Sequence, residues 1–541
     1  MERVAGAKAR EARTLLSAAL ANGPRELLDF LLPLWAGAAL GASATEVGAL
    51  VAAELAVSVV ARPAAGWLAD IRDRRWVAAA GALLYAASCL GYAFAGGLGV
   101  AFGAAAMGGV GGALLWVSVR AMAGERLADD SAVYPKLTAA EENGAWIAFV
   151  AGFAVLQAAG YRYVFLACAA ACVVAAGALL SAPARAVPPA PPLPGSTLRR
   201  LRPMLLAVVI TMTAEAAIGL LLLLHLQRRF DLEIVEIAYV FLPGAIAMAL
   251  LPTWLHRFVL RHGRTRVLAA ASVSSAVFAA ALAWAPHPAV IAALWILSGV
   301  AWAAVIPIQQ AVIAEASGAQ VGRGMGAYEA AVLLGSLIGS LAAGALYDAG
   351  PWALACALSA AVILSGAVLV PWSVRAVGVP DFPPPPPPAA APAQEVTAPN
   401  TQQAGPAPAQ QTDSPLAQQT GPAPATQADP PPPQGADSAF NPAPAPEGEP
   451  APEAEAVRER RRSPYRKLAE HAALYTVAQI VLLILAESWL LELVRGSADA
   501  LNGTREGGAS FLYGAGRIWT FILIIDVVWT IVTARRAARS R

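Results

Sequence analysis

The chain has 541 residues, of which 57% are hydrophobic and 14% charged, and its net charge is +2. Soluble domains are about 45–50% apolar and about 25% charged, so the composition indicates a membrane protein, and the balanced charge argues against a nucleic-acid-binding protein. The four cysteines form no Cys-x-x-Cys pair, the five histidines are scattered, and no catalytic or nucleotide-binding motif occurs. We therefore expect no enzyme active site, no metal site and no cofactor.

Twelve segments are long and apolar enough to cross a bilayer, which takes roughly 17–25 such residues. Six lie in residues 1–182 and six in residues 203–376, on either side of a polar, proline-rich stretch at 183–202. Their windows are 15–39, 45–68, 76–96, 99–123, 143–159, 161–182, 203–227, 235–259, 266–285, 289–315, 325–348 and 351–374. The sequence thus predicts an all-α membrane protein with two six-helix bundles joined by a cytoplasmic loop.

The rest of the chain has a different composition. Residues 377–456 are rich in Pro, Ala and Gln with almost no large apolar side chains, so they cannot bury a core and are predicted to be a disordered linker. Residues 457–541 contain a basic segment and two more apolar windows, at about 470–494 and 510–534, which predict a transmembrane hairpin. The linker and the hairpin are candidate docking sites for a protein partner.

Lysines and arginines are concentrated on one side of the expected helices, and the positive-inside rule places that side in the cytoplasm. We therefore expect a multi-pass protein of the plasma or inner cell membrane with both termini cytoplasmic. The cytoplasmic groups are Arg3, Lys8, Arg10 and Arg13; Arg72, Arg74 and Arg75; Arg126 and Lys136; Arg185, Arg199, Arg200 and Arg202; Arg257, Arg261 and Arg264; Arg323; and Arg375, against Arg162, Arg228 and Arg229 on the other side.

The two sets of six segments share landmarks at a constant offset of 190 positions. The pairs are Glu46 and Glu236, Arg74 and Arg264, Gly109 and Gly299, Glu125 and Glu315, and Gly160 and Gly350. Matches from the beginning to the end of each half indicate duplication of a six-helix unit. Parallel repeats of this kind build transporters around a central site.

The loop between the second and third segments runs from Gly66 through Asp70 to Arg74 and Arg75. With the twelve segments, the repeat and the charge asymmetry, it resembles the corresponding loop of the major facilitator superfamily, over about residues 10–376; the hairpin resembles no family. The resemblance implies a rocker-switch transporter whose first, fourth, seventh and tenth helices line a central cavity. It also implies that the Asp70 carboxylate and the Arg74 guanidinium tie helix ends of the two halves together in one conformation.

Four ionisable residues fall near the middle of their membrane segments, where charge is costly and usually functional: Arg25, Glu26, Asp29 and Glu215. Arg25 and Asp29 are four residues apart on one helix face and can neutralise each other. Arg25 and Glu215 are equivalent in the repeat, so we expect a charge contact between them across the cavity. The three carboxylates are candidates for proton coupling, and the alternative is a static Arg25–Asp29 pair.

A second group of candidates lies in the fourth and tenth segments and is expected to contact substrate: Trp116, Arg120, Trp302, Gln309 and Gln310. Arg120 either binds an anionic substrate or extends to the membrane surface. The two tryptophans either stack on a flat substrate or anchor the helices at the interface.

These observations predict a secondary active transporter that moves a small molecule by alternating access, coupled to protons. Because Ala, Leu and Val dominate the cavity helices, efflux of amphipathic compounds is favoured over the alternative, uptake of an organic anion through Arg25 and Arg120. A further alternative is a transporter-derived sensor or scaffold with negligible flux, in which the tail recruits a partner.

Overall fold

The computed structural model describes residues 2–185, 194–232, 234–349 and 351–383, together with six isolated residues between 472 and 530. Residues 2–383 belong to one compact unit. Of the expected linker at 377–456 only the first seven residues are described. The expected hairpin at 457–541 lies outside the described residues apart from the six isolated positions, so both stay predictions.

The described residues form thirteen α-helices and two short 3-10 turns, without a β-strand. The α-helices are α1 (Glu2–Leu40), α2 (Ala44–Ile71), α3 (Arg74–Ala93), α4 (Leu98–Gly124), α5 (Val133–Ala159), α6 (Tyr161–Leu180), α7 (Pro194–Arg229), α8 (Ile234–Leu250), α9 (Pro252–His262), α10 (Arg264–Ala281), α11 (Pro288–Ser317), α12 (Val321–Ala349) and α13 (Trp352–Ala376). Each expected apolar window falls on helix.

Helix boundaries differ from the windows in two ways. The helices α1 and α7 begin well before their apolar windows, and α7 starts at Pro194, inside the stretch expected to be a loop. Polar residues continue a helix outside the bilayer without contributing to an apolar window, so hydropathy alone underestimates its length. The eighth window is broken into α8 and α9, which are bent by 58°. Pro252 opens α9 and, lacking a backbone N–H, cannot continue the hydrogen bonding of α8.

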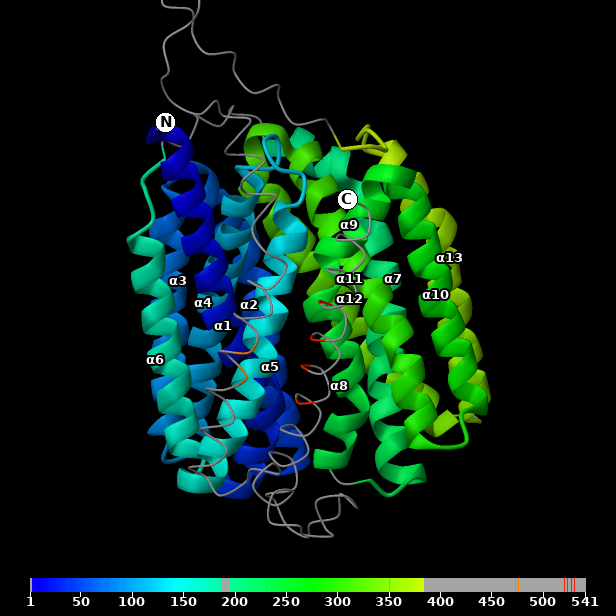
Figure 1. Cartoon of the computed structure of the whole chain (residues 1–541). Coiled ribbons are helices and arrows are strands. Elements are labelled where there is room, and N and C mark those ends of the chain that lie inside the picture. Colours follow the sequence, from blue (N-terminus) through cyan, green and yellow to red (C-terminus); the bar gives the residue numbers. More distant parts are fainter. Residues whose placement is uncertain are drawn as a thin grey trace, which may run out of the picture. The chain divides into compact units, whose positions relative to one another are not determined.

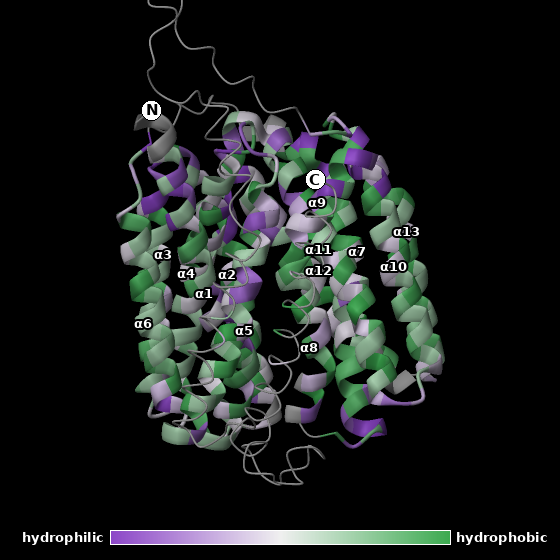
Figure 2. Ribbon diagram, viewed as in Figure 1, coloured by the Kyte–Doolittle hydropathy of each residue, from purple (hydrophilic) through white to green (hydrophobic). Residues whose placement is uncertain are grey.

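Length and apolar composition qualify eight helical segments of the described chain as membrane spans, or nine when the bent pair is counted, with α11 and α12 taken together as Pro288–Ala343. The helices α1 and α5 are not among them, and both carry ionisable residues within their length. Figure 2 shows hydrophobic residues along the middle of the helices and hydrophilic ones gathered toward both ends. The chain is a multi-pass membrane protein.

The helices pack mainly within two groups, α1–α6 and α7–α13, which Figure 1 shows on opposite sides of the view. Contacts between the groups join α2 and α4 to α12, and α5 to α8, α9 and α11. Many of these contacts lie at the end where α2 meets α3 and α11 meets α12. We call this the basic end, because the arginines of the α2–α3 and α4–α5 junctions and the starts of α10 and α12 lie there.

Glycines allow close helix crossings that repeat between the groups. A Cβ atom on Gly109 of α4 would lie 2.6 Å from the carbonyl oxygen of Glu54 in α2, and one on Gly299 of α11 would lie 2.5 Å from that of Gly244 in α8. Both members of the first pair differ from those of the second by 190 positions. The offset seen in the sequence therefore corresponds to the same backbone contact in both groups.

Candidate functional site

The end of α2 meets the start of α12 through one carboxylate. Asp70, which is 1% exposed, accepts hydrogen bonds from the backbone N–H of Gly322 at 2.7 Å and of Arg323 at 3.0 Å. A Cβ atom on Gly66 would lie 2.6 Å from the carbonyl oxygen of Gly322, so the backbones touch. A carboxylate on free N–H groups at a helix start is stabilised by the hydrogen bonds and by the helix dipole. Asp70 thus holds the two groups together.

Arg74 contacts only its own group in the described structure, although the resemblance implies that it ties helix ends of the two halves together. Its side chain donates to the carbonyl oxygens of Ala69 at 3.1 Å and Ala121 at 3.2 Å, and pairs with Glu125 at 3.2 Å. The separation from Asp70 is 3.7 Å. Arg74 therefore joins α3 to α2 and α4, and holds Asp70 in place beside α12.

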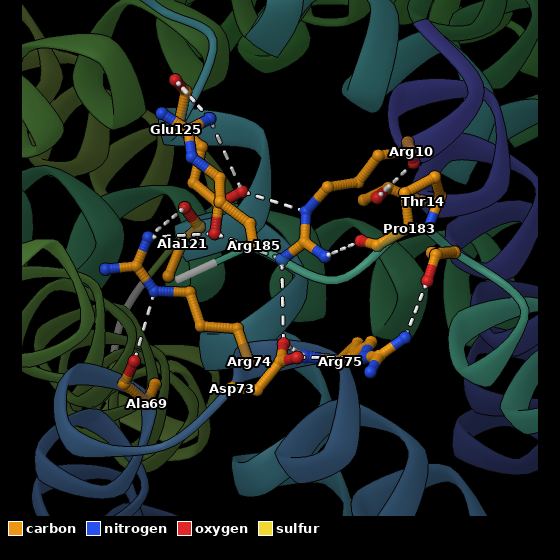
Figure 3. Close-up of polar contacts among 11 residues, drawn as sticks. Arg10, Thr14, Ala69, Asp73, Arg74, Arg75, Ala121, Glu125, Pro183 and Arg185 are labelled. Atoms are coloured by element: carbon orange, nitrogen blue, oxygen red, sulfur yellow. Dashed lines mark hydrogen bonds and ion pairs between the residues drawn. The ribbon is translucent and has the colours of Figure 1, made fainter. Parts of the chain in front are cut away.

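Glu125 receives a second arginine from the start of the chain, as Figure 3 shows. Arg10 of α1 donates to Glu125 at 2.9 Å and to the carbonyl oxygen of Pro183 at 2.7 Å. Arg75 binds Asp73 at 2.8 Å and the carbonyl oxygen of Ala182 at 2.8 Å. These bonds fix the α2–α3 loop against α1, α4 and the segment after α6.

The second group repeats this arrangement, except that the capping aspartate comes from another part of the chain. Arg264 pairs with Glu315 as Arg74 does with Glu125, at 2.5 Å. In the first group Asp73 caps α3 by accepting from the backbone N–H of Arg75. Its repeat equivalent is Gly263, and the cap on α10 comes instead from Asp381, whose carboxylate accepts from the backbone N–H of Thr265 at 2.7 Å. The cap that Asp73 provides in the first group thus comes from beyond α13 in the second.

Four buried charged side chains form a second connection between the groups. Glu329 of α12 accepts a hydrogen bond from Arg62 of α2 and lies 3.0 Å from Nε of Arg120 in α4. Arg120 also contacts Glu141 of α5 at 3.4 Å. All four side chains are at most 9% exposed. The cluster, which we call the Glu329 cluster, has two positive and two negative charges.

Arg120 therefore neither extends to the membrane surface nor stands open to substrate. Its guanidinium lies 5.2 Å from the ring centre of Trp116, and that of Arg25 lies 5.7 Å from the same ring. Nearby, Gln309 accepts from the Tyr328 hydroxyl at 3.2 Å. The side-chain oxygen of Gln310 is buried and finds no hydrogen-bond partner among the described residues. Trp116 thus lies against Arg120, and Gln309 lies beside Tyr328, the neighbour of Glu329 in α12.

The charged residues of α1 form the pair expected from their spacing. Arg25 lies 3.9 Å from Asp29 and 3.7 Å from Glu26. Their side chains are partly exposed, at 35% for Arg25, 38% for Glu26 and 58% for Asp29. Arg25 also interacts electrostatically with Glu329 of α12. The three α1 residues thus lie close to the Glu329 cluster and remain more accessible than its members.

Glu215 does not meet Arg25, contrary to the expected contact between repeat equivalents. It accepts hydrogen bonds from Ser275 of α10 and from the indole of Trp302 in α11. The residues around it, including Thr211 and Ser272, enclose a small void within the second group. Glu215 is therefore a half-buried carboxylate with neutral polar partners, in a setting unlike that of the α1 residues.

The α4–α5 loop makes a third contact between the groups. Ser131 lies 3.0 Å from Nε2 of His256 in α9. Beside it, Asp130 is partly buried, which raises the pKa of its carboxyl, but hydrogen bonds from Lys136 and from the backbone N–H of Ala132 lower that pKa below its usual value overall. The Asp130 carboxylate is thus charged at neutral pH and fixes the loop that touches α9.

Sequence reasoning missed Arg62 and Glu141 as parts of the connection between the groups. Neither has a charged counterpart 190 positions away, so the repeat gives no signal for them. Both are nevertheless ionisable residues inside helices, the criterion that selected Arg25 and Asp29. The signal was present, but their partners lie on other helices: Arg62 pairs with Glu329, 267 residues further along the chain, and Glu141 pairs with Arg120.

An all-α membrane fold with two related groups of helices, tied together at one end by buried ionic contacts, defines a membrane carrier. The chain belongs to the Major Facilitator Superfamily, whose family model matches residues 14–259 and 204–524. The structure is also similar to the crystal structure of the human organic anion transporter MFSD10 (TETRAN), with a TM-score of 0.56 and 16% sequence identity over 67% of this chain and 99% of that one. A comparison with curated proteins found no match. As a member of this family the chain is a transporter of small molecules and not an enzyme.

Proposed function

We propose that this transporter exports amphipathic compounds by alternating access in exchange for protons. The observation that carries the proposal is the Asp29 carboxylate, which is 58% exposed within α1 and has Arg25 as its cation at 3.9 Å. A carboxylate inside a membrane helix is costly and is retained where it serves transport. An exposed pair at this distance is weak, so water, a proton or a cationic substrate can compete for the carboxylate.

The balance of charge around Arg25 favours coupling to protons and transport of cationic amphipathic substrates. Glu26 and Asp29 are both partly exposed, against the single cation Arg25. Arg120 is already paired with Glu141 and Glu329, so it offers no open positive charge. Glu215 adds a third carboxylate with neutral partners. A carboxylate can exchange a bound proton for a cationic substrate when its hydration changes as the transporter opens, because desolvation disfavours its charged form.

The contacts at the basic end support a gating role for Asp70 and the Glu329 cluster. Opening this end separates Asp70 from the start of α12, and Glu329 from Arg62 and Arg120. By the positive-inside rule we place the basic end in the cytoplasm of a plasma or inner membrane. The structure then corresponds to a state closed toward the cytoplasm, and the Gly66–Arg75 loop acts as the conformational switch.

A second candidate, transport of an organic anion, has one observation in its favour. The Arg25 guanidinium is 35% exposed and lies over the Trp116 ring, an arrangement that can bind a flat anion by charge and stacking. The similar human structure is described as an organic anion transporter. Replacement of Arg25 by glutamine separates the candidates, because it abolishes anion transport but leaves a cation site at Asp29.

The test starts with a thermal-stability screen of the purified chain against amphipathic cations and anions, since a ligand raises apparent stability whatever the direction of transport. Efflux of tetraphenylphosphonium from proteoliposomes is then measured with and without a pH gradient. We expect Asp29→Asn and Glu215→Gln to lose gradient-driven flux, while Glu46→Gln, at the exposed start of α2, keeps it. Full gradient-driven flux in both variants refutes proton coupling through these groups.

The scaffold alternative is tested in the same proteoliposomes with a chain that ends after residue 383. Flux that survives this truncation makes the tail an accessory of a working transporter. An intact chain that carries no flux under any gradient, with a tail that captures a partner, favours the scaffold.

A further inference from the structure

A cavity of about 610 Å³ lies at the end of the helices opposite the basic end. It is formed by the end of α7, the α10–α11 connection, the end of α12 and the start of α13, all within the second group. It is separate from the α1 charges, from Glu215 and from the Glu329 cluster. Its volume lies in the range of about 300–1,000 Å³ that small-molecule sites occupy.

One wall of the cavity is aromatic and held in place. The His225 ring stacks on the Trp352 ring with centroids 3.9 Å apart and planes at 6°, and the edge of Phe230 meets His225 at 5.6 Å. The Trp352 indole N–H donates to the carbonyl oxygen of Leu282 at 3.1 Å. The wall therefore presents a fixed apolar surface, and the His225 ring lies at its edge.

The other wall carries positive charge. Arg228 and Arg229, both exposed, line the cavity beside His225, and the described lining residues include no acidic side chain. This end of the helices is poor in cations, since Arg162 is the other arginine that the loop pattern places there. An arginine pair at a cavity on this side works against the usual distribution of charge. The pair gives this wall a positive charge to which an anion can bind.

An exposed apolar side chain also lies at the cavity. Trp284, in the α10–α11 connection, lines the cavity and is 78% exposed. Tryptophan is enriched where membrane proteins cross the boundary between lipid and water. A ligand here can place an anionic group on the arginines and an apolar part along the aromatic wall and Trp284.

We propose that this cavity binds the head of an amphipathic anion, a phosphate or carboxylate on an apolar chain, against Arg229, Arg228 and His225. Such a ligand comes either from the membrane, as an anionic phospholipid, or from solution. Arginine suits both anions, because its planar guanidinium binds their oxygens in pairs. The site is distinct from the proposed transport site.

The test measures binding of dodecyl phosphate to the full chain in a neutral detergent, through tryptophan fluorescence. We expect Arg229→Gln to weaken binding at least about tenfold, from loss of charged hydrogen bonds, and Arg229→Lys to weaken it less, because lysine keeps the charge but not the paired hydrogen bonds. The matched control is Arg162→Gln, which removes an exposed arginine that lies 4.7 Å from the Phe94 ring outside the cavity. It should change binding less than about twofold, because a distant exposed charge is screened by salt.

Equal binding by Arg229→Gln and the native chain overturns the proposal, as does an equal loss in Arg162→Gln, which would show unspecific attraction. The unliganded melting temperature checks folding, and His225→Ala, which removes the stacked ring, gives a second variant that must also weaken binding. The source of the ligand follows from nanodiscs. If phosphatidylglycerol but not phosphatidylcholine competes with dodecyl phosphate, the ligand is a lipid, and if neither competes it is a soluble anion.

Discussion

Replacement of Glu329 by glutamine is the most direct perturbation of the connection between the two groups of helices. Glu329 contacts Arg62 and Arg120, and none of the three side chains is more than 9% exposed. Glutamine keeps the size and one acceptor oxygen but removes the charge, which leaves the two arginines with Glu141 alone. Removing one partner of a buried ion pair costs about 3–5 kcal/mol.

This cost falls on one conformation. Glu329 lies on α12, whereas Arg62 and Arg120 lie on α2 and α4, so the three meet only while the basic end is closed. In an open state water can solvate both arginines. Since about 1.4 kcal/mol changes an equilibrium constant tenfold, the closed-to-open ratio should fall by roughly two to four orders of magnitude.

Distances between spin labels measure this ratio. Arg72 and Arg261 are exposed residues near the basic end, one in each group, and cysteines placed there can be labelled because the four native cysteines are buried. We expect Glu329→Gln to lengthen the main label distance. The control is Glu315→Gln, which breaks the pair with Arg264 inside the second group and should lower the melting temperature without moving the labels. A native distance distribution in Glu329→Gln refutes the reasoning.

Three further changes test single contacts. Asp70→Asn keeps one acceptor oxygen, so it turns one charge-assisted hydrogen bond at the start of α12 into a neutral one and loses the other, and it should open the basic end by about 1–3 kcal/mol in the same label measurement. Gly66→Ala places a Cβ atom 2.6 Å from a carbonyl oxygen of α12 and should weaken the closed state by about 1–3 kcal/mol, whereas Gly103→Ala, with open space around it, should not. Asp381→Ala removes the cap of α10 and should lower stability by about 1 kcal/mol in thermal unfolding, as Asp73→Ala should for α3; an unchanged melting temperature contradicts the capping role.

The sequence predicted the parts of the fold that repeat or that depend on local composition. Apolar length located the helices, and the offset of 190 matched Arg74 to Arg264 and Glu125 to Glu315, which the structure joins by the same ion pair in each group. That Asp381 caps α10 as Asp73 caps α3 could not be predicted, because the residue comes from a distant part of the chain and only folding brings it to α10.

The site was predicted less completely for a related physical reason. Arg25 and Asp29 share one helix, so their contact follows from helical geometry. Arg25 and Glu215 are equivalent in the repeat, but symmetry relates their positions without requiring them to touch. They meet only if both side chains point at the axis, and Glu215 turns instead toward Ser275. The partners of a buried charge depend on packing between helices, which no periodicity records.

The repeat also shows that the basic end is closed by two related but unequal contacts. A shift of 190 positions carries Asp70 to Leu260 and Gly66 to His256 in α9. The α2–α12 contact has an aspartate on a helix start and touching glycines, whereas the related contact of α9 with the α4–α5 loop has a neutral pair, His256 with Ser131. Hydrogen bonds to charged groups are worth about 1.5–3 kcal/mol and neutral ones about 0.5–1.5. Because the stronger contact joins α12 to α2, and the Glu329 cluster joins α12 to α2 and α4, we expect separation of α12 from these two helices to set most of the free energy of opening, with the α9 side as the pivot.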